Sequence, residues 1–139
     1  MYLIDTNVIS ESRKDKAANR GVQAFFKNAA TQATDLYLSV ITIGELRRGV
    51  ELIRHRGDGP QSEKLEAWLA KLLVNYATQI LPLDQDIAQL WGRLRVPHHE
   101  NAIDKLIAAT ALIHDLTLVT RNTRDFADTG VRLLDPFTA

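Results

Sequence analysis

The chain has no cysteine, no excess of either charge and no apolar run long enough to cross a bilayer. Without cysteine, disulfides and thiolate metal sites are excluded, which suits a reducing compartment. Lys plus Arg and Asp plus Glu both total 17, so bulk positive charge does not attach this protein to nucleic acid. There is also no basic segment followed by an apolar stretch and a cleavage site. We therefore expect a cytoplasmic protein with no membrane attachment.

The 139 residues are enough to bury one core, and they contain no internal repeat or low-complexity segment. We predict a single domain over residues 1–139. A balanced total charge still permits an enzyme that holds a phosphodiester through a metal ion, because the acids of such a site lower the sum.

Short β-rich runs alternate with segments of helical periodicity along the whole chain. Strands are expected at 2–4, 36–41, 79–83, 116–120 and 131–134. Helices are expected at 6–12, 19–30, 42–55, 65–76, 84–96 and 101–114, with a partly helical turn at 121–128. The 101–114 helix is apolar nearly all round, which is typical of a buried helix.

This alternation predicts an α/β fold: a central, mostly parallel sheet of about four to five strands with helices on both faces. In such sheets ligands bind at the carboxyl ends of the strands.

Four separated acids share that location in the predicted fold. Asp5 follows the first strand, Glu45 and Asp104 lie in the first turns of helices, and Asp125 follows the fourth strand. Asn122 stands three residues before Asp125. A doubly wound sheet would bring these residues together at one edge.

Taken singly, each acid also has a purely structural interpretation. Thr42 with Glu45, and Asn101 with Asp104, match capping boxes at helix starts. Asp5 suits an N-cap or turn, and Asp125 suits an Asx turn. These interpretations remain open at this point.

Taken together, clustered carboxylates repel one another, and a divalent cation removes the conflict. Hard cations prefer carboxylate and water oxygens, with phosphate completing the shell. The chemistry that follows is metal-assisted hydrolysis of a phosphodiester.

Four ordered motifs carry a resemblance: LIDTNVIS from residue 3, SVITIGELRRG from 39, IDKLIAATA from 103 and LVTRNTRDF from 118. Together they resemble the PIN-domain family, and within it the VapC/FitB-type toxins of bacterial toxin–antitoxin pairs. The motifs span almost the whole chain, whereas residues 57–98 match only in helical character.

The resemblance implies a three-layer PIN-like fold and a magnesium- or manganese-dependent ribonuclease. It also implies an RNA substrate, inhibition by a cognate antitoxin, a homodimer and a joint assembly on operator DNA. Asp5, Glu45 and Asp104 match the core acids of the family. For the fourth acid we favour Asp125, with Asn122 as its neighbour.

Five further residues belong to the predicted site as metal-water or substrate contacts. Thr6 and Asn7 match polar residues of the family, and their side chains suit holding a carboxylate or a metal-bound water. Asn122 is the neighbour of the fourth acid. Arg121 and Arg124 lie beside the pocket and suit phosphate.

The turn before the buried helix departs from the family pattern. Its His98 and His99 could touch substrate or shuttle protons, but we leave them outside the site as solvated residues. Lys105 either snorkels to the surface or reaches the rim of the pocket.

Two other hypotheses compete with the nuclease. One is a phosphoryl-transfer enzyme with Asp5 as nucleophile, although Asn7 stands where such enzymes carry a second acid. The other is a non-catalytic binding module whose acids are only helix caps.

Overall fold

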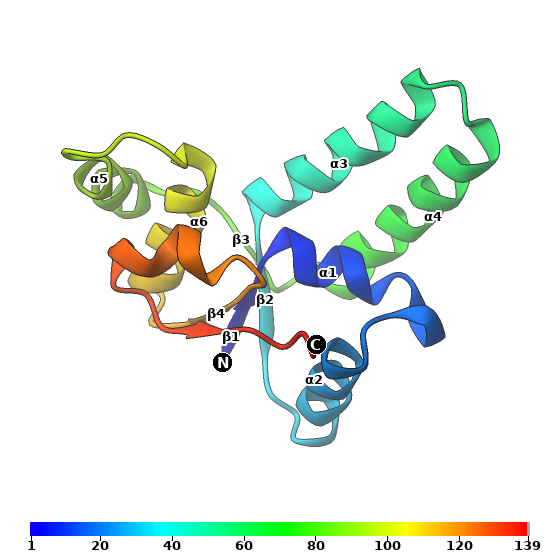
Figure 1. Cartoon of the computed structure of the whole chain (residues 1–139), viewed down its shortest axis with the longest axis horizontal. Helices are drawn as coiled ribbons and strands as arrows, with labels where there is room; N and C mark the ends of the chain where they lie inside the picture. Colours follow the sequence, from blue (N-terminus) through cyan, green and yellow to red (C-terminus); the bar gives the residue numbers. More distant parts are fainter. Residues whose placement is uncertain (139) are drawn as a thin grey trace.

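The computed structural model describes residues 1–138, and its centre is a five-stranded parallel sheet (Figure 1). The strands are β1 (Tyr2–Ile4), β2 (Leu36–Ser39), β3 (Ile80–Leu81), β4 (Thr117–Val119) and β5 (Leu133–Leu134), in the order β3-β2-β1-β4-β5. Each neighbouring pair is parallel. The predicted α/β fold and its strand number are therefore confirmed.

The helices are α1 (Thr6–Ser12), α2 (Arg20–Thr31), α3 (Val40–His55), α4 (Gly59–Asn75), α5 (Gln85–Leu94) and α6 (Ala102–Ile113), with 3₁₀ segments η1 (Asp15–Ala17) and η2 (Thr123–Thr129). Side chains of Asn19, Asp58 and Asp84 accept backbone N–H bonds at the starts of α2, α4 and α5. These caps explain why most predicted boundaries agree to within a few residues.

Two predicted boundaries are wrong. The helix expected from residue 65 begins at Gly59, where Asp58 caps it and Pro60 suits its first turn.

The β-rich run 36–41 was expected to form a strand throughout, with a helix from Thr42, but α3 begins at Val40. The Ser39 hydroxyl accepts a hydrogen bond from the Ile41 amide at 3.0 Å, and it caps the helix there. The cap overrides the β-propensity of Val40 and Ile41.

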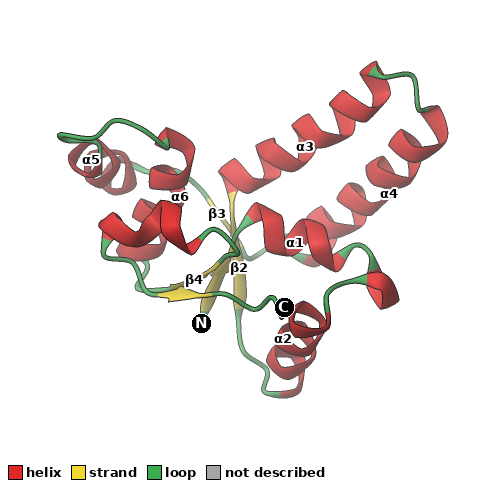
Figure 2. Ribbon diagram, in the orientation of Figure 1, coloured by secondary structure: helices red, strands yellow, loops and turns green. Residues whose placement is uncertain are grey.

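The sheet separates two helical layers (Figures 1 and 2). Alternating side chains along the strands face opposite cores. Ile4, Leu38 and Val119 pack on the side of α1 to α4, and Leu3 and Leu118 pack on the side of α6 and η2. This is the predicted three-layer arrangement.

Strand β1 is central, and the chain order reverses beside it. The chain runs from β1 to β2 and β3 on one side, then crosses to β4 and β5 on the other. A crevice outside the carboxyl ends of β1 and β4 is the usual ligand site of such sheets. Asp5 and Thr120 follow these two strand ends directly.

Helix α6 is buried along most of its length, as predicted, with Ile107, Ala108, Ala109 and Ala111 at most 1% exposed. Its first and last turns nevertheless expose Ile103 and Ile113. Across residues 1–138, no helix combines the length and apolarity that a membrane span requires.

Candidate active site

Asp5 is the best-anchored acid at the sheet edge, with only 4% of its surface exposed. Its Oδ1 accepts the Thr6 amide at 2.8 Å, so the acid caps α1 as the structural interpretation predicted. Its Oδ2 accepts Thr120 Oγ1 at 2.8 Å and Asn7 Nδ2 at 3.2 Å. Asp5 is therefore both a helix cap and a carboxylate held rigidly at the junction of β1 and β4.

Burial raises the pKa of Asp5, and repulsion from the nearby Glu45 adds to the effect. The hydrogen bonds from Thr120, Thr6 and Asn7 act in the opposite direction because they stabilise the carboxylate.

Glu45 reaches the same edge from α3, although in its second turn rather than the first. It accepts the Thr6 hydroxyl at 2.7 Å, and Thr6 Oγ1 also lies 3.3 Å from Thr42 Oγ1. The predicted capping box of Thr42 and Glu45 is wrong, since Ser39 caps this helix. The exposed Glu45 side chain is thus tied to the residue next to Asp5.

Asp104 lies in the first turn of α6 and is half-buried. Desolvation raises its pKa to about 6, and repulsion from Asp5, Asp125 and Glu45 adds to the shift in that order. Asn101 makes no side-chain cap bond, and its φ is +55°, so the predicted capping device is absent. All four acids therefore interact around Asp104.

Asp125 stands in the first turn of η2 and is exposed. Its amide donates to the Asn122 carbonyl oxygen at 3.0 Å, and the Asn122 amide donates to Thr120 Oγ1 at 3.0 Å. Asp125 is close enough to raise the pKa of Asp104. Its choice over Asn122 as the fourth ligand stays a prediction.

The set of oxygen donors fits a hard divalent cation, because four carboxylates that repel one another are what such an ion neutralises. Within residues 1–138, however, no three acidic or histidine side chains form a group arranged to bind one ion. The exposed Glu45 and Asp125 side chains would have to rotate toward the buried Asp5 to complete a shell.

The predicted neighbours of the acids have distinct contacts. Asn7 bridges the strands, since its Oδ1 accepts the Arg121 amide at 3.1 Å while its Nδ2 reaches Asp5. The Arg121 guanidinium lies 4.6 Å from the centre of the Phe137 ring, so part of its surface is engaged away from the acids. Arg124 lines a cavity beside Asp125.

Thr120 is the residue that the sequence prediction missed. Its hydroxyl joins Asp5, Asn7 and Asn122, residues from both sides of the β1–β4 junction. Its position at the predicted carboxyl end of a strand, inside the LVTRN motif, was the available signal.

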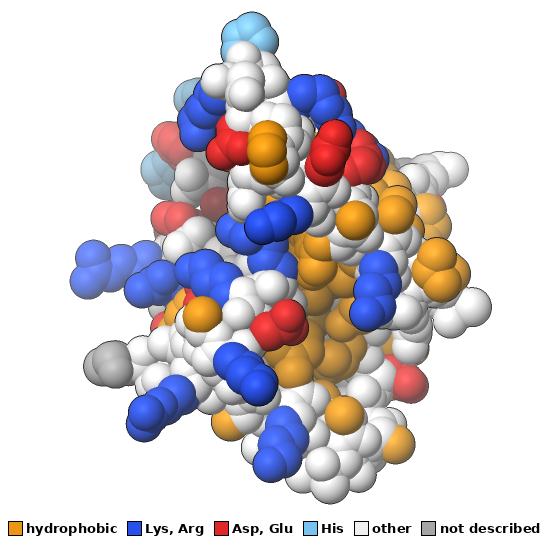
Figure 3. Space-filling model, turned by 90° about the vertical axis from the view of Figure 1, so that its right-hand side faces the viewer, with side chains coloured by type: hydrophobic (Ala, Val, Ile, Leu, Met, Phe, Trp, Pro, Cys, Tyr) orange, Lys and Arg blue, Asp and Glu red, His pale blue; other side chains and the backbone are white. Residues whose placement is uncertain are grey.

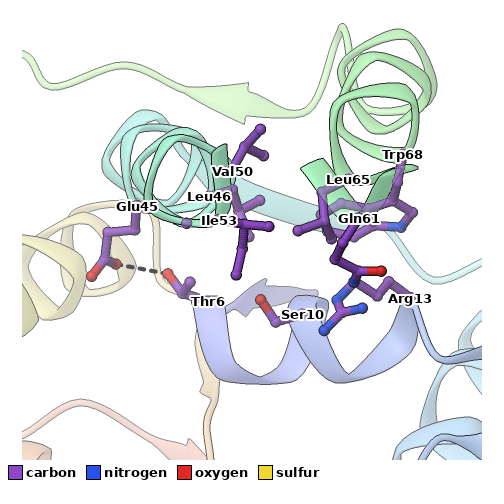
Figure 4. A pocket seen from close by; sticks show the side chains of 11 residues that line it. Thr6, Ser10, Arg13, Glu45, Leu46, Val50, Ile53, Gln61, Leu65 and Trp68 are labelled. Carbon is purple, nitrogen blue, oxygen red and sulfur yellow. Dashed lines mark hydrogen bonds between the residues drawn. The ribbon is translucent and has the colours of Figure 1, made fainter. Parts of the chain in front are cut away.

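Two hollows flank the acids. The first, the apolar groove of about 230 Å³, has Glu45 and Thr6 at one end and is lined by Leu46, Val50, Ile53, Leu65 and Trp68 among others. Figure 4 shows these side chains reaching from α3 and α4 into the space over α1. On this side of the molecule, Figure 3 shows hydrophobic side chains in a hollow bordered by Lys and Arg.

The second hollow, the polar cavity of about 550 Å³, has Asp125 in its wall. The 96–101 loop, the start of α6 and η2 enclose it, and Lys105, Arg124 and Asn101 are among the lining residues. His98 also lines it, although its side chain is 75% exposed. The acids thus lie between an apolar and a polar hollow.

The fold and these four acids at the reversal of strand order define the class of protein. The chain belongs to the PIN domain family, whose model matches residues 2–131. It is 36% identical over 143 residues to Toxin FitB of Neisseria gonorrhoeae, with 99% of each chain covered. It is 31% identical over 146 residues to the VapC ribonuclease Y4jK of Sinorhizobium fredii, with 99% of this chain and 98% of the relative covered.

Solved structures agree with this assignment. The crystal structure of FitAcB from Neisseria gonorrhoeae matches with a TM-score of 0.84 and 37% identity, over 98% of each chain. A toxin–antitoxin complex from Klebsiella pneumoniae matches with a TM-score of 0.67 and 27% identity, over the whole of both chains. The predicted PIN-like fold and family are confirmed.

Proposed function

We propose that this protein is the toxin of a toxin–antitoxin pair and acts as a Mg²⁺- or Mn²⁺-dependent endoribonuclease. The observation that carries the proposal is the interaction of Asp104 with Asp5, Asp125 and Glu45, acids from four separate segments. The fold itself does not require four carboxylates close enough to repel one another, so their placement points to a function. The relatives named as a toxin and as a VapC ribonuclease support the same activity.

In this proposal the protein's own side chains hold the acids in place. Thr120 and Asn7 orient Asp5 Oδ2, and Thr6 directs Glu45 toward Asp5. A bound divalent cation would supply an activated water and neutralise charge on the phosphate. Asp5, Glu45, Asp104 and Asp125 would hold that ion, and Arg124 lies on the substrate side of Asp125.

The test is cleavage of a total-RNA pool with Mg²⁺, with EDTA, and with an Asp5→Asn protein prepared identically. Asp5→Asn should reduce the rate of cleavage by at least about 100-fold. Loss of a group that only orients a metal ligand typically costs roughly 10- to 100-fold in activity, and loss of the ligand itself should cost more. Asp86→Asn, which changes an exposed acid in the first turn of α5, should cleave normally. Cleavage that survives EDTA or Asp5→Asn contradicts the proposal.

No observation favours the phosphoryl-transfer hypothesis beyond the position of Asp5, and Asn7 stands where such enzymes carry a second acid. The binding-module hypothesis accounts for Asp5 as a cap but not for Glu45 or Asp104. It predicts no cleavage and no rise of the melting temperature with Mg²⁺.

The apolar groove is the surface we assign to the antitoxin. Its apolar lining, from α3, α4 and α1, suits the apolar face of an amphipathic segment. Because Glu45 lines one end of the groove, a segment bound there would extend to the four acids and block access of RNA to them. Relatives solved as toxin–antitoxin complexes support such a partner.

A homodimer and a joint assembly with the antitoxin on operator DNA complete the proposal. The structure of FitAB bound to a DNA fragment supports the second part. For the first, Val40 and Ile103 expose apolar side chains at the starts of α3 and α6, two helices in contact. Light scattering on the purified chain alone tests the homodimer, and the same measurement with antitoxin and operator DNA tests the joint assembly.

A further inference from the structure

The polar cavity contains a buried cation that the proposed chemistry does not use. Lys105 is only 8% exposed, although a lysine in an otherwise apolar helix normally extends to solvent. Its Nζ donates to the carbonyl oxygen of His98. This contact holds the ammonium at the wall of the cavity that also contains Asp125, which agrees with the second expectation for Lys105 and not with the first.

The ammonium of Lys105 is incompletely satisfied by the protein. It has three N–H donors, and one carbonyl is its single hydrogen-bond partner among the described residues. No carboxylate of residues 1–138 lies within ion-pair distance of it. The exposed Glu100 carboxylate lies near enough for the Lys105 charge to add to the lowering of its pKa, which its own backbone hydrogen bond dominates, but it makes no direct ion pair with the ammonium. A phosphate in the cavity would supply the hydrogen-bond acceptors that the ammonium lacks.

Other groups in the same wall suit a phosphate. Arg124, from η2, lines the same cavity as Lys105. Asn101 gives no side-chain cap to α6, so the first amides of this twelve-residue helix lack that acceptor and are available to an anion. Two elements, α6 and η2, therefore bring donors or positive charge to one cavity.

The cavity also contains acids, and these restrict the ligand. Glu100 and Asp128 line it as well as Asp125, so a bare polyanion would meet repulsion. A nucleotide combines a phosphate for the cations with base amino groups that carboxylates accept. The volume of about 550 Å³ is within the range of small-molecule pockets.

We infer that the polar cavity binds the nucleotide next to the cleaved phosphodiester, with Lys105 and Arg124 holding its phosphate. The inference rests on the proposed ribonuclease function, because Asp125 is shared between the cavity and the acids. Lys105 is then a substrate-binding residue that positions the RNA backbone beside the acids.

The test measures binding without cleavage. A short single-stranded RNA of mixed sequence is titrated onto Asp5→Asn protein in EDTA, at several salt concentrations. Adding Lys105→Met should weaken binding about tenfold, the usual contribution of one charged hydrogen bond. It should also reduce the slope of log K against log salt by about 0.7, the value for one phosphate contact on single-stranded RNA.

Three further variants isolate the phosphate contact. Lys105→Arg should keep the slope, and Arg124→Gln, at an exposed residue, should lower it without affecting folding. Lys27→Met, on the exposed surface of α2, should change nothing.

Unchanged binding by Lys105→Met and Arg124→Gln overturns the inference. Weaker binding of Lys105→Met with an unchanged slope also overturns it, since Lys105 would then only position the 96–101 loop. If the wild-type protein cleaves no RNA while these variants weaken binding as expected, the nuclease proposal fails and the subsite remains.

Discussion

The apolar groove and the polar cavity flank the same four acids and differ in the side chains that line them. The groove is walled by aliphatic side chains and Trp68 from α3 and α4. The cavity is walled mostly by charged and polar groups around the start of α6, together with Leu94, Val96 and Pro97. Glu45 belongs to the first hollow and Asp125 to the second.

This difference indicates how one small domain separates two kinds of ligand. A segment that buries apolar surface gains more free energy in the groove than in the mainly polar cavity. A phosphate gains from a desolvated ammonium, which only the cavity offers. Each hollow can therefore be altered without changing the other, and four predictions test that separation.

The largest effect on stability is expected in the core that supports the polar cavity. Phe126 is completely buried in η2 and packs in the core beneath α6. Phe126→Ala should lower the free energy of unfolding by about 3–5 kcal/mol, since a large void is left. Urea denaturation measures it. Phe137→Ala, at a half-buried ring near the C-terminus, should lower it clearly less, and equal losses would contradict this prediction.

The next effect concerns the apolar groove. Ile53→Glu should reduce affinity for the cognate antitoxin by about 100-fold, because complex formation would bury an unpaired charge. RNA cleavage by the free toxin should be unchanged. Calorimetric titration and the RNA assay measure the two quantities, with Ile53→Leu as the control. A parallel loss of cleavage would show that the two hollows are not independent.

A smaller effect follows from the raised pKa of Asp104, which is about 6 in the folded protein against an ordinary 3.8. Between these values the folded state holds more protons than the unfolded state, so stability falls as pH rises from about 4 to about 6. Asp104→Asn removes this loss. In EDTA near pH 7.5 its melting temperature should exceed that of wild type by roughly 3 °C, after allowance for solvent screening.

The gain of Asp104→Asn should vanish near pH 4, where the wild-type carboxyl is also largely protonated. Asp86→Asn serves as the matched acid-to-amide change outside the cluster. A gain that persists at low pH would assign the effect to packing and not to repulsion among the acids.

The smallest effect is expected on the α3–α4 hairpin that carries the groove. Arg47 pairs with Glu66 at 2.7 Å and with Glu51 at 3.2 Å, and Arg54 also reaches Glu66. All four side chains are 40–50% exposed. Arg47→Ala should therefore lower the free energy of unfolding by less than about 1 kcal/mol, and less still in 1 M salt. A loss that salt does not diminish would point to packing of the side-chain stem.

The sequence alone predicted the succession of strands and helices along the chain and the parallel sheet, but not the order of the strands in it. Alternation of β-rich runs with helical stripes determined the parallel sheet, and Asp5 and Asp125 followed strands as expected. The boundary at Ser39 was misjudged because a single cap outweighed two β-branched residues. Local periodicity carries no information on such a competition.

The contacts that make the site were decided by tertiary structure. Thr120 bonds to Asp5 from 115 positions away, and this contact exists only because β1 and β4 are neighbours in the sheet. Lys105 is directed into a cavity by a loop whose path the sequence does not encode in any short pattern. The residue types of the acids and their order were thus properties of the sequence, whereas their mutual repulsion and the buried, half-satisfied ammonium beside them arise from packing alone.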